Sequence, residues 1–435
     1  MTTNRNNLNS SGYGENIFTV GAADSPFINL GTLTTSGDYA SPISVGADGI
    51  TVTNKGSLVT SGNGAYGIFA GEALGTQFDN VTVLNYGSIT TSGDFLDDGV
   101  NFAFGAEGIE QNGNGGTVKN FGTITTLGPD SAGIAHVGAN STILNYGNIN
   151  SAGIGIVVDT VDGTETGNSV VNYGKIHTTV DESHGIWLLI GDNVAKNYGT
   201  IQADGIHSFA MAMEGDGNHG ENYGTLLATG GQGRGVLMNG EDLSFDNFGT
   251  IQTTGADSVG VRYASENLAG TDGGTFTNYG KVVSAGWAVL GADSDDHVIN
   301  GGSMTGDVDL GAGNDSYDAA KGGVLHGSLT LGDGDDVIIF EKGGGSLTVT
   351  DFAAGAGSDD VIDLSGLGYS SFSQVMGHAT QSGSDVILKL GAKDQIVLEN
   401  VTLGALSADD FSFAASALPH PMAPSHVLHG DHLFG

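Results

Sequence analysis

The chain has 435 residues, and its 76 glycines against 18 Phe, 12 Tyr and 2 Trp disfavour large globular cores. Its 49 acidic and 12 basic residues give a formal charge of −37, which opposes compaction unless cations bind and excludes nucleic acids and anionic membranes as partners. The absence of cysteine excludes disulfides and thiolate chemistry, and no apolar run is long enough to span a membrane.

The chain begins without a recognisable leader. Residues 1–20 lack the charged start and the apolar core of a secretory signal peptide. We therefore expect them to form an N-terminal segment or cap.

An Asn-x-Gly triplet, usually with Tyr or Phe in the middle, then recurs along most of the chain. The triplets begin at Asn29, Asn54, Asn85, Asn120, Asn145, Asn172, Asn197, Asn222, Asn247 and Asn278, with a degenerate copy at Asn300. Five of the ten intervals are 25 residues long. A recurring period of this size is typical of solenoid repeats.

Short strand-forming runs flank each triplet. Residues 142–144 (Thr-Ile-Leu) precede one triplet, 123–126 (Thr-Ile-Thr-Thr) follow another, and pairs such as Gly133-Ile134 come next. A unit this short cannot bury its own apolar face, so stacked units must share one core. The sequence thus predicts an all-β fold, a right-handed parallel β-helix (β-solenoid) of ~25-residue coils over residues 21–288. We expect the asparagines to form an amide ladder, and each triplet glycine to occupy a turn with positive φ.

The aromatic residues of the triplets predict a column along the solenoid. Its members are Tyr86, Phe121, Tyr146, Tyr173, Tyr198, Tyr223, Phe248 and Tyr279. A stacked structural ladder is the favoured interpretation, because aromatic stripes usually pack, and a sugar-binding platform is the alternative.

Two arginines fall in neighbouring coils. Arg234 and Arg262, with Asp257, Glu266 or Asp216 as acidic companions, would suit an enzyme acting on uronates, which needs cations to hold carboxylates and a base to remove a proton. Surface salt bridges are the simpler interpretation.

A glycine-aspartate motif replaces the triplet over residues 289–350. Copies occur at 291–296 (Gly-Ala-Asp-Ser-Asp-Asp), 311–315 (Gly-Ala-Gly-Asn-Asp) and 332–336 (Gly-Asp-Gly-Asp-Asp). Calcium takes about six to eight oxygen ligands, which the carbonyls of small turns and the aspartates would supply. The candidate calcium ligands are Asp293, Asp295, Asp296, Gly311, Gly313, Asp315, Gly332, Asp333, Gly334 and Asp336.

These copies resemble the hemolysin-type (RTX) calcium repeat, whose nonapeptide reads Gly-Gly-x-Gly-x-Asp-x-apolar-x. The second and third copies match it from the second glycine to the apolar position, whereas the first copy has Asp293 in place of a glycine. The resemblance implies a short calcium-binding β-roll over 289–350. The spacing near 20 residues favours one row of Ca²⁺ ions over two.

Residues 351–413 resemble the C-terminal domain of type I secreted proteins, as found after the catalytic domain of serralysin-type proteases. The resemblance rests on Asp351-Phe352 and on residues 359–365, 384–388 and 406–413. It implies a β-rich secretion domain, export by a type I apparatus from a Gram-negative bacterium, and an extracellular or cell-surface location.

The last segment, residues 414–435, contains His420, His426, His429 and His432. Four imidazoles would suit zinc or nickel, but their irregular spacing and three prolines favour a disordered tail.

The sequence therefore predicts a secreted calcium-binding structural protein rather than an enzyme, namely a surface-layer, filament or biofilm-matrix subunit or an adhesin. Open solenoid ends favour head-to-tail or lateral self-association, and surface or matrix glycans are further candidate partners. No His-Glu-x-x-His or Gly-x-Ser-x-Gly string is present. A polysaccharide lyase or epimerase and a glycan-binding module are the alternatives.

Overall fold

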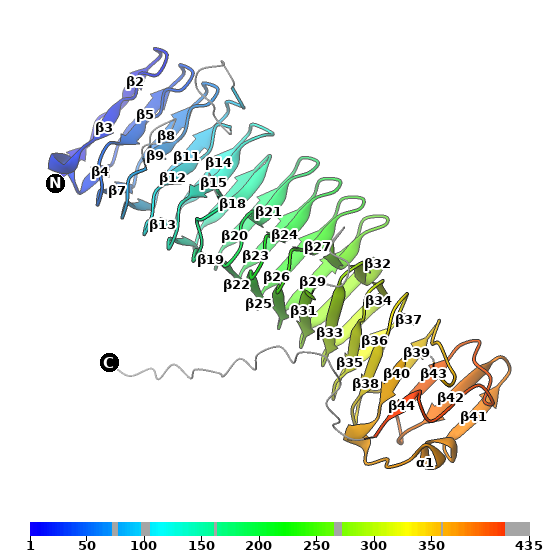
Figure 1. The fold of residues 1–435 in the computed structure, drawn as a ribbon. Coiled ribbons are helices and arrows are strands. Elements are labelled where there is room, and N and C mark those ends of the chain that lie inside the picture. The colour runs from blue at the N-terminus through cyan, green and yellow to red at the C-terminus, as the bar shows by residue number, and fades with distance from the viewer. Residues whose placement is uncertain (72–76, 97–104, 161–162, 265–271, 358–359, 414–435) are drawn as a thin grey trace.

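The chain folds as a parallel β-solenoid, which confirms the predicted architecture (Figure 1). The computed structural model describes residues 1–435 except 72–76, 97–104, 161–162, 265–271, 358–359 and 414–435. Glu266 and the tail predicted to be disordered therefore lie outside the described residues. In the repeat region each coil contributes short strands to three faces, and these strands pair in parallel with their equivalents in the next coil.

The first face is a 16-stranded sheet that runs the whole length of the solenoid. Its strands are β1 (Thr2–Asn4), β4 (Phe27–Asn29), β7 (Thr51–Asn54), β10 (Thr82–Asn85), β13 (Thr117–Asn120), β16 (Thr142–Asn145), β19 (Ser169–Asn172), β22 (Val194–Asn197), β25 (His219–Asn222), β28 (Ser244–Asn247), β31 (Asp272–Asn278), β33 (Asp295–Asn300), β35 (Ser316–Ala319), β38 (Val337–Phe340), β40 (Val361–Asp363) and β44 (Phe411–Ser412).

The second face follows the triplet in each coil. Its strands are β2 (Leu8–Ser10), β5 (Thr32–Thr35), β8 (Ser57–Thr60), β11 (Ser88–Thr91), β14 (Thr123–Thr126), β17 (Asn148–Ser151), β20 (Lys175–Thr178), β23 (Thr200–Ala203), β26 (Thr225–Ala228) and β29 (Thr250–Thr253).

The third face follows the next turn. Its strands are β3 (Phe18–Val20), β6 (Ile43–Val45), β9 (Ile68–Ala70), β12 (Ile109–Asn112), β15 (Ala132–Val137), β18 (Ile154–Asp159), β21 (His184–Leu188), β24 (Phe209–Glu214), β27 (Arg234–Asn239) and β30 (Val259–Tyr263). The short 3₁₀ turn η1 (Ala22–Asp24) follows its first strand.

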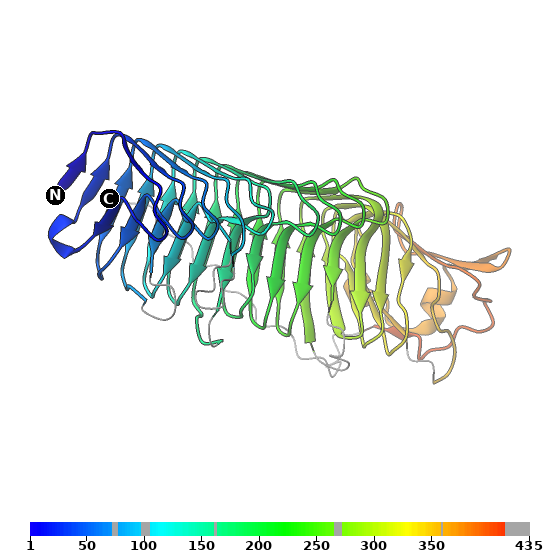
Figure 2. The same ribbon diagram turned by 90° about the horizontal axis from the view of Figure 1, so that it is seen from above.

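The second and third faces merge where the glycine-aspartate motif begins. The long strand β32 (Lys281–Ala292) pairs with both β29 and β30, and β34 (Ser303–Gly311) pairs with β36 (Val324–His326) and β37 (Leu329–Thr330). The first face continues through residues 289 and 351 without a break. The sheet of the first face therefore runs through the predicted β-helix and β-roll segments into the C-terminal one, and Figure 2 shows this stack from above.

Antiparallel strands lie at the C-terminal end of the stack. Strand β43 (Gln395–Leu398) pairs in parallel with β39 (Ser346–Val349), and it continues into antiparallel pairs with β42 (Asp385–Lys389) and β41 (Ala379–Ser382). The helix α1 (Phe372–Met376) and the 3₁₀ turn η2 (Ser365–Leu367) lie beside them (Figure 1). No helix among the described residues has the length and apolar character needed to cross a membrane.

Like residues lie over like residues in the core. On the second face Ile89, Ile124, Ile149, Ile176 and Ile201 pair in successive coils, and all five are fully buried. Each buried isoleucine contributes about 1.5–3 kcal/mol relative to an exposed one. The stack thus supplies the continuous core that single coils lack.

The predicted asparagine ladder is present. Each Nδ2 donates to the Oδ1 of the asparagine one coil further on, at 2.8–3.0 Å, from Asn29 to Asn300. The ladder begins one coil earlier than predicted, because Asn4 donates to Asn29 at 2.8 Å. Residues 1–20 thus form a first coil in register with the second. The sequence concealed this coil because Arg5 and Asn6 replace the aromatic and glycine positions of the triplet.

The triplet glycines do not have the positive φ that we expected. None of those following Asn29 to Asn278 is among the described residues with a left-handed backbone. They are required because the coils approach closely. A Cβ on Gly56 would lie 2.0 Å from the carbonyl oxygen of Gly31, and one on Gly87 would lie 2.0 Å from that of Gly56.

Candidate functional sites

The glycine-aspartate turns bring predicted calcium ligands into one line. The main-chain N–H of Asp296 donates to Oδ1 of Asp315 at 2.7 Å, that of Asp315 donates to Asp336 at 2.8 Å, and that of Asp336 donates to Asp360 at 3.4 Å. All four side chains are buried. We call these four residues the aspartate column.

Two carboxylates of this column have one oxygen without a hydrogen bond. Oδ2 of Asp315 and Oδ2 of Asp336 are buried, and neither has a hydrogen-bond partner in the part of the chain that the structure describes. Burial, with neighbouring aspartates as a further cause, raises the pKa of Asp315 to about 9 and that of Asp336 to about 7. Both groups therefore favour a proton or a cation over a bare negative charge.

The predicted glycines form the turns beside the column. Gly311 and Gly313 lie below Gly332 and Gly334, and all four have positive φ, between +97° and +144°. A Cβ on Gly332 would lie 1.7 Å from the carbonyl oxygen of Gly311. Only glycine fits these positions, so the turns place main-chain carbonyls one coil apart.

The remaining predicted ligands are arranged differently. Oδ1 of Asp295 accepts the N–H of Asn314 at 2.7 Å, and Oδ1 of Asn314 accepts the N–H of Asp335 at 3.0 Å, which makes a second, more exposed column. The side chains of Asp293 and Asp333 are exposed and outside both columns.

Sequence reasoning missed two buried carboxylates near the motif. Asp360 ends a further copy, Gly355-x-Gly357-x-x-Asp360, that is one residue longer than the others. Asp410 accepts the N–H groups of Gly355 and Ser407, at 2.9 and 2.7 Å. The Gly-x-Gly spacing was the signal that could have extended the motif past residue 350.

The oxygen atoms of the aspartate column and of the glycine turns are of the kind that binds calcium. Their side chains alone do not surround an ion. Within the described part of the chain, no three His, Cys, Asp or Glu side chains converge in the way a preformed metal centre requires. An ion at the column would be held by Asp315 or Asp336 together with carbonyl oxygens of the glycine turns. Such oxygen ligands are the kind that calcium prefers.

The predicted aromatic ladder forms on the surface. Eight rings from Tyr86 to Tyr279 stack with centroids 4.7–5.3 Å apart and planes within 15° of parallel. Each ring is 40–57 % exposed, through its edge rather than its faces. A sugar needs a free ring face to stack on, so the geometry favours the structural interpretation of the ladder.

The two arginines do share the third face, as the sequence suggested. The guanidinium of Arg234 lies over the ring of Phe209, 5.1 Å from its centroid, and Nη1 of Arg262 donates to the carbonyl oxygen of Gly291. Neither arginine forms a salt bridge among the described residues. The predicted companions Asp257 and Asp216 therefore do not neutralise them. Burial and the charge of Arg262 lower the pKa of Arg234.

An acidic cavity of about 260 Å³ lies on the same face. Glu107 and Glu110 line it and are 1 % and 3 % exposed, and the Oε2 atom of each has no hydrogen-bond partner among the residues described. Burial and the charge of Glu110 raise the pKa of Glu107, and burial with the charge of Asp159 raises the pKa of Glu110 to about 7. Sequence reasoning missed this acid pair because a β-strand pattern does not reveal that outward residues are buried.

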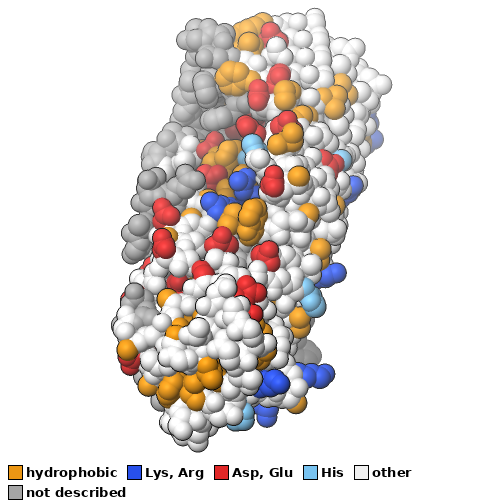
Figure 3. Space-filling model, turned by 90° about the vertical axis from the view of Figure 1, so that its right-hand side faces the viewer, with side chains coloured by type: hydrophobic (Ala, Val, Ile, Leu, Met, Phe, Trp, Pro, Cys, Tyr) orange, Lys and Arg blue, Asp and Glu red, His pale blue; other side chains and the backbone are white. Residues whose placement is uncertain are grey.

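A second cavity, of about 340 Å³, adjoins the first. Glu182, His184, His207, Phe209 and Arg234 line it. The ring of His184 stacks on Phe209 at 4.5 Å and meets the edge of Trp187, which lines the acidic cavity, at 4.7 Å. Figure 3 shows a face on which a small group of Lys or Arg side chains is surrounded by hydrophobic and acidic ones.

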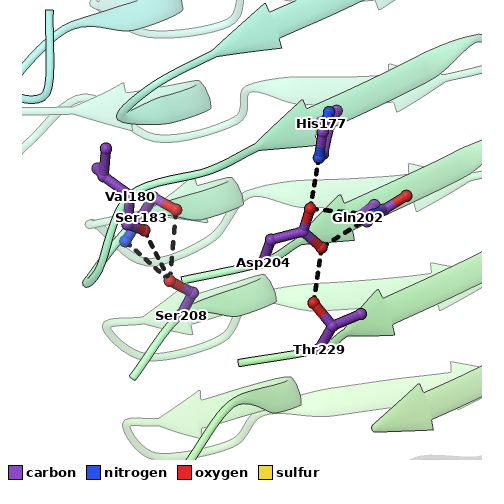
Figure 4. Close-up of polar contacts among 7 residues, drawn as sticks. All are labelled: His177, Val180, Ser183, Gln202, Asp204, Ser208 and Thr229. Carbon is purple, nitrogen blue, oxygen red and sulfur yellow. Dashed lines mark hydrogen bonds and ion pairs between the residues drawn. The ribbon is translucent and has the colours of Figure 1, made fainter. Parts of the chain in front are cut away.

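A polar network on the second face has a structural role. Asp204 accepts hydrogen bonds from His177, Gln202 and Thr229, at 2.7–3.1 Å, and so joins three coils (Figure 4). Although partial burial opposes it, these bonds lower the pKa of Asp204. In Figure 4 the ring of His177 contacts Asp204, whereas Ser208 bonds to Ser183 and Val180. The network holds neighbouring coils in register.

Comparison with known proteins gives a partial likeness. A stretch of 75 residues, 17 % of this chain, is 37 % identical to the endo-1,3-1,4-beta-glycanase EglC of Rhizobium meliloti (strain 1021). The match spans only 15 % of the length of that protein. No family model matches the chain.

Proposed function

We propose that the protein is a secreted, calcium-binding structural or adhesive protein, such as a surface-layer, filament or biofilm-matrix subunit or an adhesin. The observation that carries the proposal is the aspartate column, in which buried carboxylates stack one per coil. Nearly all of the described chain is solenoid scaffold, which supports a structural role.

Calcium offsets a cost that the column otherwise imposes. A buried carboxylate without a counter-charge is unfavourable, and stacking several of them adds mutual repulsion. When bound, calcium supplies positive charge to Asp315 and Asp336. When the free calcium concentration is about 100 times the Kd of a site, binding adds about 2.7 kcal/mol to the free energy of unfolding.

Dependence on calcium also bears on where the protein acts. The resemblance to type I secreted proteins implies export from a Gram-negative cell by a type I apparatus. A C-terminal part that needs calcium stays unfolded where the ion is scarce and folds outside, where it is abundant. The antiparallel strands at the C-terminal end differ from a solenoid coil, so lateral contact between rods is the favoured mode of self-association (Figure 1).

Thermal unfolding followed by circular dichroism, with calcium and with chelator, tests the proposal. We expect Asp336→Asn and Asp315→Asn to reduce the stabilisation by calcium. The same variants should be at least as stable as the parent in chelator, because each replaces a buried carboxyl, whose raised pKa reflects the cost of its charge, with a neutral amide.

Asp242→Asn is the matched control. Asp242 is exposed in a turn of the repeat region, so the variant removes one charge and leaves the aspartate column intact. Equal calcium responses in the parent, the control and both column variants would exclude the column as a calcium site.

A glycan-directed function is the second candidate, as an enzyme or a binding module. The observation that favours it is the pair of arginines without acidic partners beside aromatic and carboxyl groups on the third face. The partial likeness to a glycanase agrees with it but assigns no reaction to this chain. Assay of the parent on a panel of acidic and neutral glycans, with Arg234→Ala and Arg262→Ala, tests for depolymerisation or epimerisation.

A further inference from the structure

We propose that the third face binds an extended glycan that is mostly neutral and carries isolated carboxylates. The proposed binding surface extends from the acid pair (Glu107 and Glu110) to the arginine pair (Arg234 and Arg262). The inference rests on the glycan-directed candidate function and is independent of calcium.

Strand register places these groups along one face. Outward positions pair coil by coil from Glu110 through Ala135 and Val157 to Trp187, and then through Ala212 and Leu237 to Arg262. Six steps of ~4.8 Å separate Glu110 from Arg262, or about 29 Å. A single ligand reaching both ends must therefore be an extended polymer.

Rare side chains gather on this face. Trp187 and Trp287 are the only two tryptophans of the chain, and both occupy outward positions here. Trp187 is held in place because its Nε1 donates to Oε1 of Glu214 at 2.8 Å. Trp287 is 37 % exposed. Fixed, partly exposed indole rings provide apolar surface for the C–H faces of sugars.

The arginine pair indicates an anionic group on the ligand. In a chain with a charge of −37, it is unusual that two neighbouring arginines form no salt bridge with any of the described residues. Nη1 of Arg234 donates to the carbonyl oxygen of Gln232 at 3.5 Å, whereas its buried Nε has no hydrogen-bond partner among the described residues. Arg234 stacks on Phe209 through its face, and the N–H groups at the edge of a guanidinium are the part that binds carboxylates.

The acidic cavity limits how many charges the ligand can carry. Glu107, Glu110, Asp130 and Asp159 all line it, so a polyanion would be repelled there. The other residues that line the cavity, such as Val157, Trp187 and Leu189, are apolar and suit the C–H faces of neutral sugars. The lining favours neutral sugars at this end and a carboxylate at the arginine end.

A peptide is a poorer fit than a glycan. The N–H and C=O groups of the third-face strands are used by parallel pairing with the adjacent coils, so a peptide cannot add to this face as a further strand. Recognition must come from outward side chains alone.

Isothermal titration calorimetry of the full chain in calcium tests the inference. The probes are a neutral β-glucan hexasaccharide, the same hexasaccharide with one glucuronate, and hexagalacturonate. We expect the single-glucuronate probe to bind at least about tenfold more tightly than either of the others, which corresponds to about 1.4 kcal/mol.

The double variant Arg234→Gln/Arg262→Gln should reduce binding of that probe to the level of the neutral one. The control Lys196→Gln removes a positive charge from the first face, where Lys196 pairs with Glu221, and should bind like the parent. A variant with the parent's melting temperature separates loss of binding from loss of fold.

Three results would overturn the inference: no binding of any probe, tightest binding of hexagalacturonate, or binding unchanged in the double arginine variant. None of them bears on the calcium proposal, because all titrations are made with calcium present and the fold is checked by melting. Conversely, a column without calcium affinity would leave the binding result intact.

Discussion

At the scale of single residues, the acid pair links stability to pH. The pKa of Glu110 is raised to about 7, whereas an unfolded Glu titrates near 4.3. The folded state therefore holds the proton more tightly, so the stabilisation is complete below about pH 4 and is lost as pH rises through about 7. Asn112 and Asp159 influence the pKa of Glu110, and the charge of Glu110 in turn raises the pKa of Glu107 and of Tyr66.

We expect Glu110→Gln to flatten the fall in melting temperature between about pH 5 and 8, by at least about 2 °C relative to the parent. The measurement is circular dichroism at a series of pH values with calcium held constant. Glu241→Gln, in a turn of the repeat region, is the control for loss of one charge. A parental slope in Glu110→Gln would show that Glu110 ionises without cost.

At the scale of elements, the glycine turns determine whether the aspartate column can form. Gly334 has a φ of +144°, and a Cβ there would lie 1.6 Å from the carbonyl oxygen of Gly313. Backbone strain of this kind costs about 1–3 kcal/mol before the turn is displaced. The turn and the column are adjacent in sequence, so distorting one misplaces the other.

Gly334→Ala should lower the melting temperature of the C-terminal part and weaken its response to calcium. Titrating chelator into the folded protein while following circular dichroism measures both effects. Gly404→Ala is the control, because nothing lies within 4 Å of a Cβ at Gly404. Equal behaviour of the two variants would contradict the close approach of the turns.

At the scale of the whole molecule, one continuous stack contains two kinds of stabilisation. The asparagine ladder and the isoleucine columns stabilise the N-terminal coils, and neither requires an ion. The coils from β33 to β44 contain the buried aspartates. Because each coil contacts mainly its neighbours, stability is approximately a sum of local terms and can be lost from one end.

We expect chelator to accelerate amide hydrogen exchange in strands β33 to β44 while β10 to β29 stay protected. Hydrogen exchange followed by mass spectrometry measures this directly, and re-addition of calcium should restore protection. Uniform loss of protection along the chain would mean that the stack unfolds as one cooperative unit. Unchanged exchange in chelator would mean that calcium does not stabilise the fold.

The sequence by itself determined the repeating part of this protein. The triplet period predicted the coil, the asparagine ladder and the aromatic ladder, because every coil must place the same residue at the same point. It also located the glycine turns at 311–313 and 332–334, where positive φ requires glycine. For the triplet glycines the sequence led us to expect positive φ, whereas they are needed because neighbouring coils approach closely. That approach exists only once the coils are stacked, so a single coil does not reveal it.

Only the tertiary structure decided what lies on the outer surface of the third face. Glu107 and Trp187 are far apart in sequence, yet they line one cavity because coil lengths vary and strand pairing sets which residues become neighbours. The outward positions of the third face, unlike the stacked aromatic rings, are under no shared packing constraint, so their residue types do not recur with the coil period. Burial of Glu107, Glu110 and the aspartate column likewise depends on the coils above and below, which a single strand does not reveal.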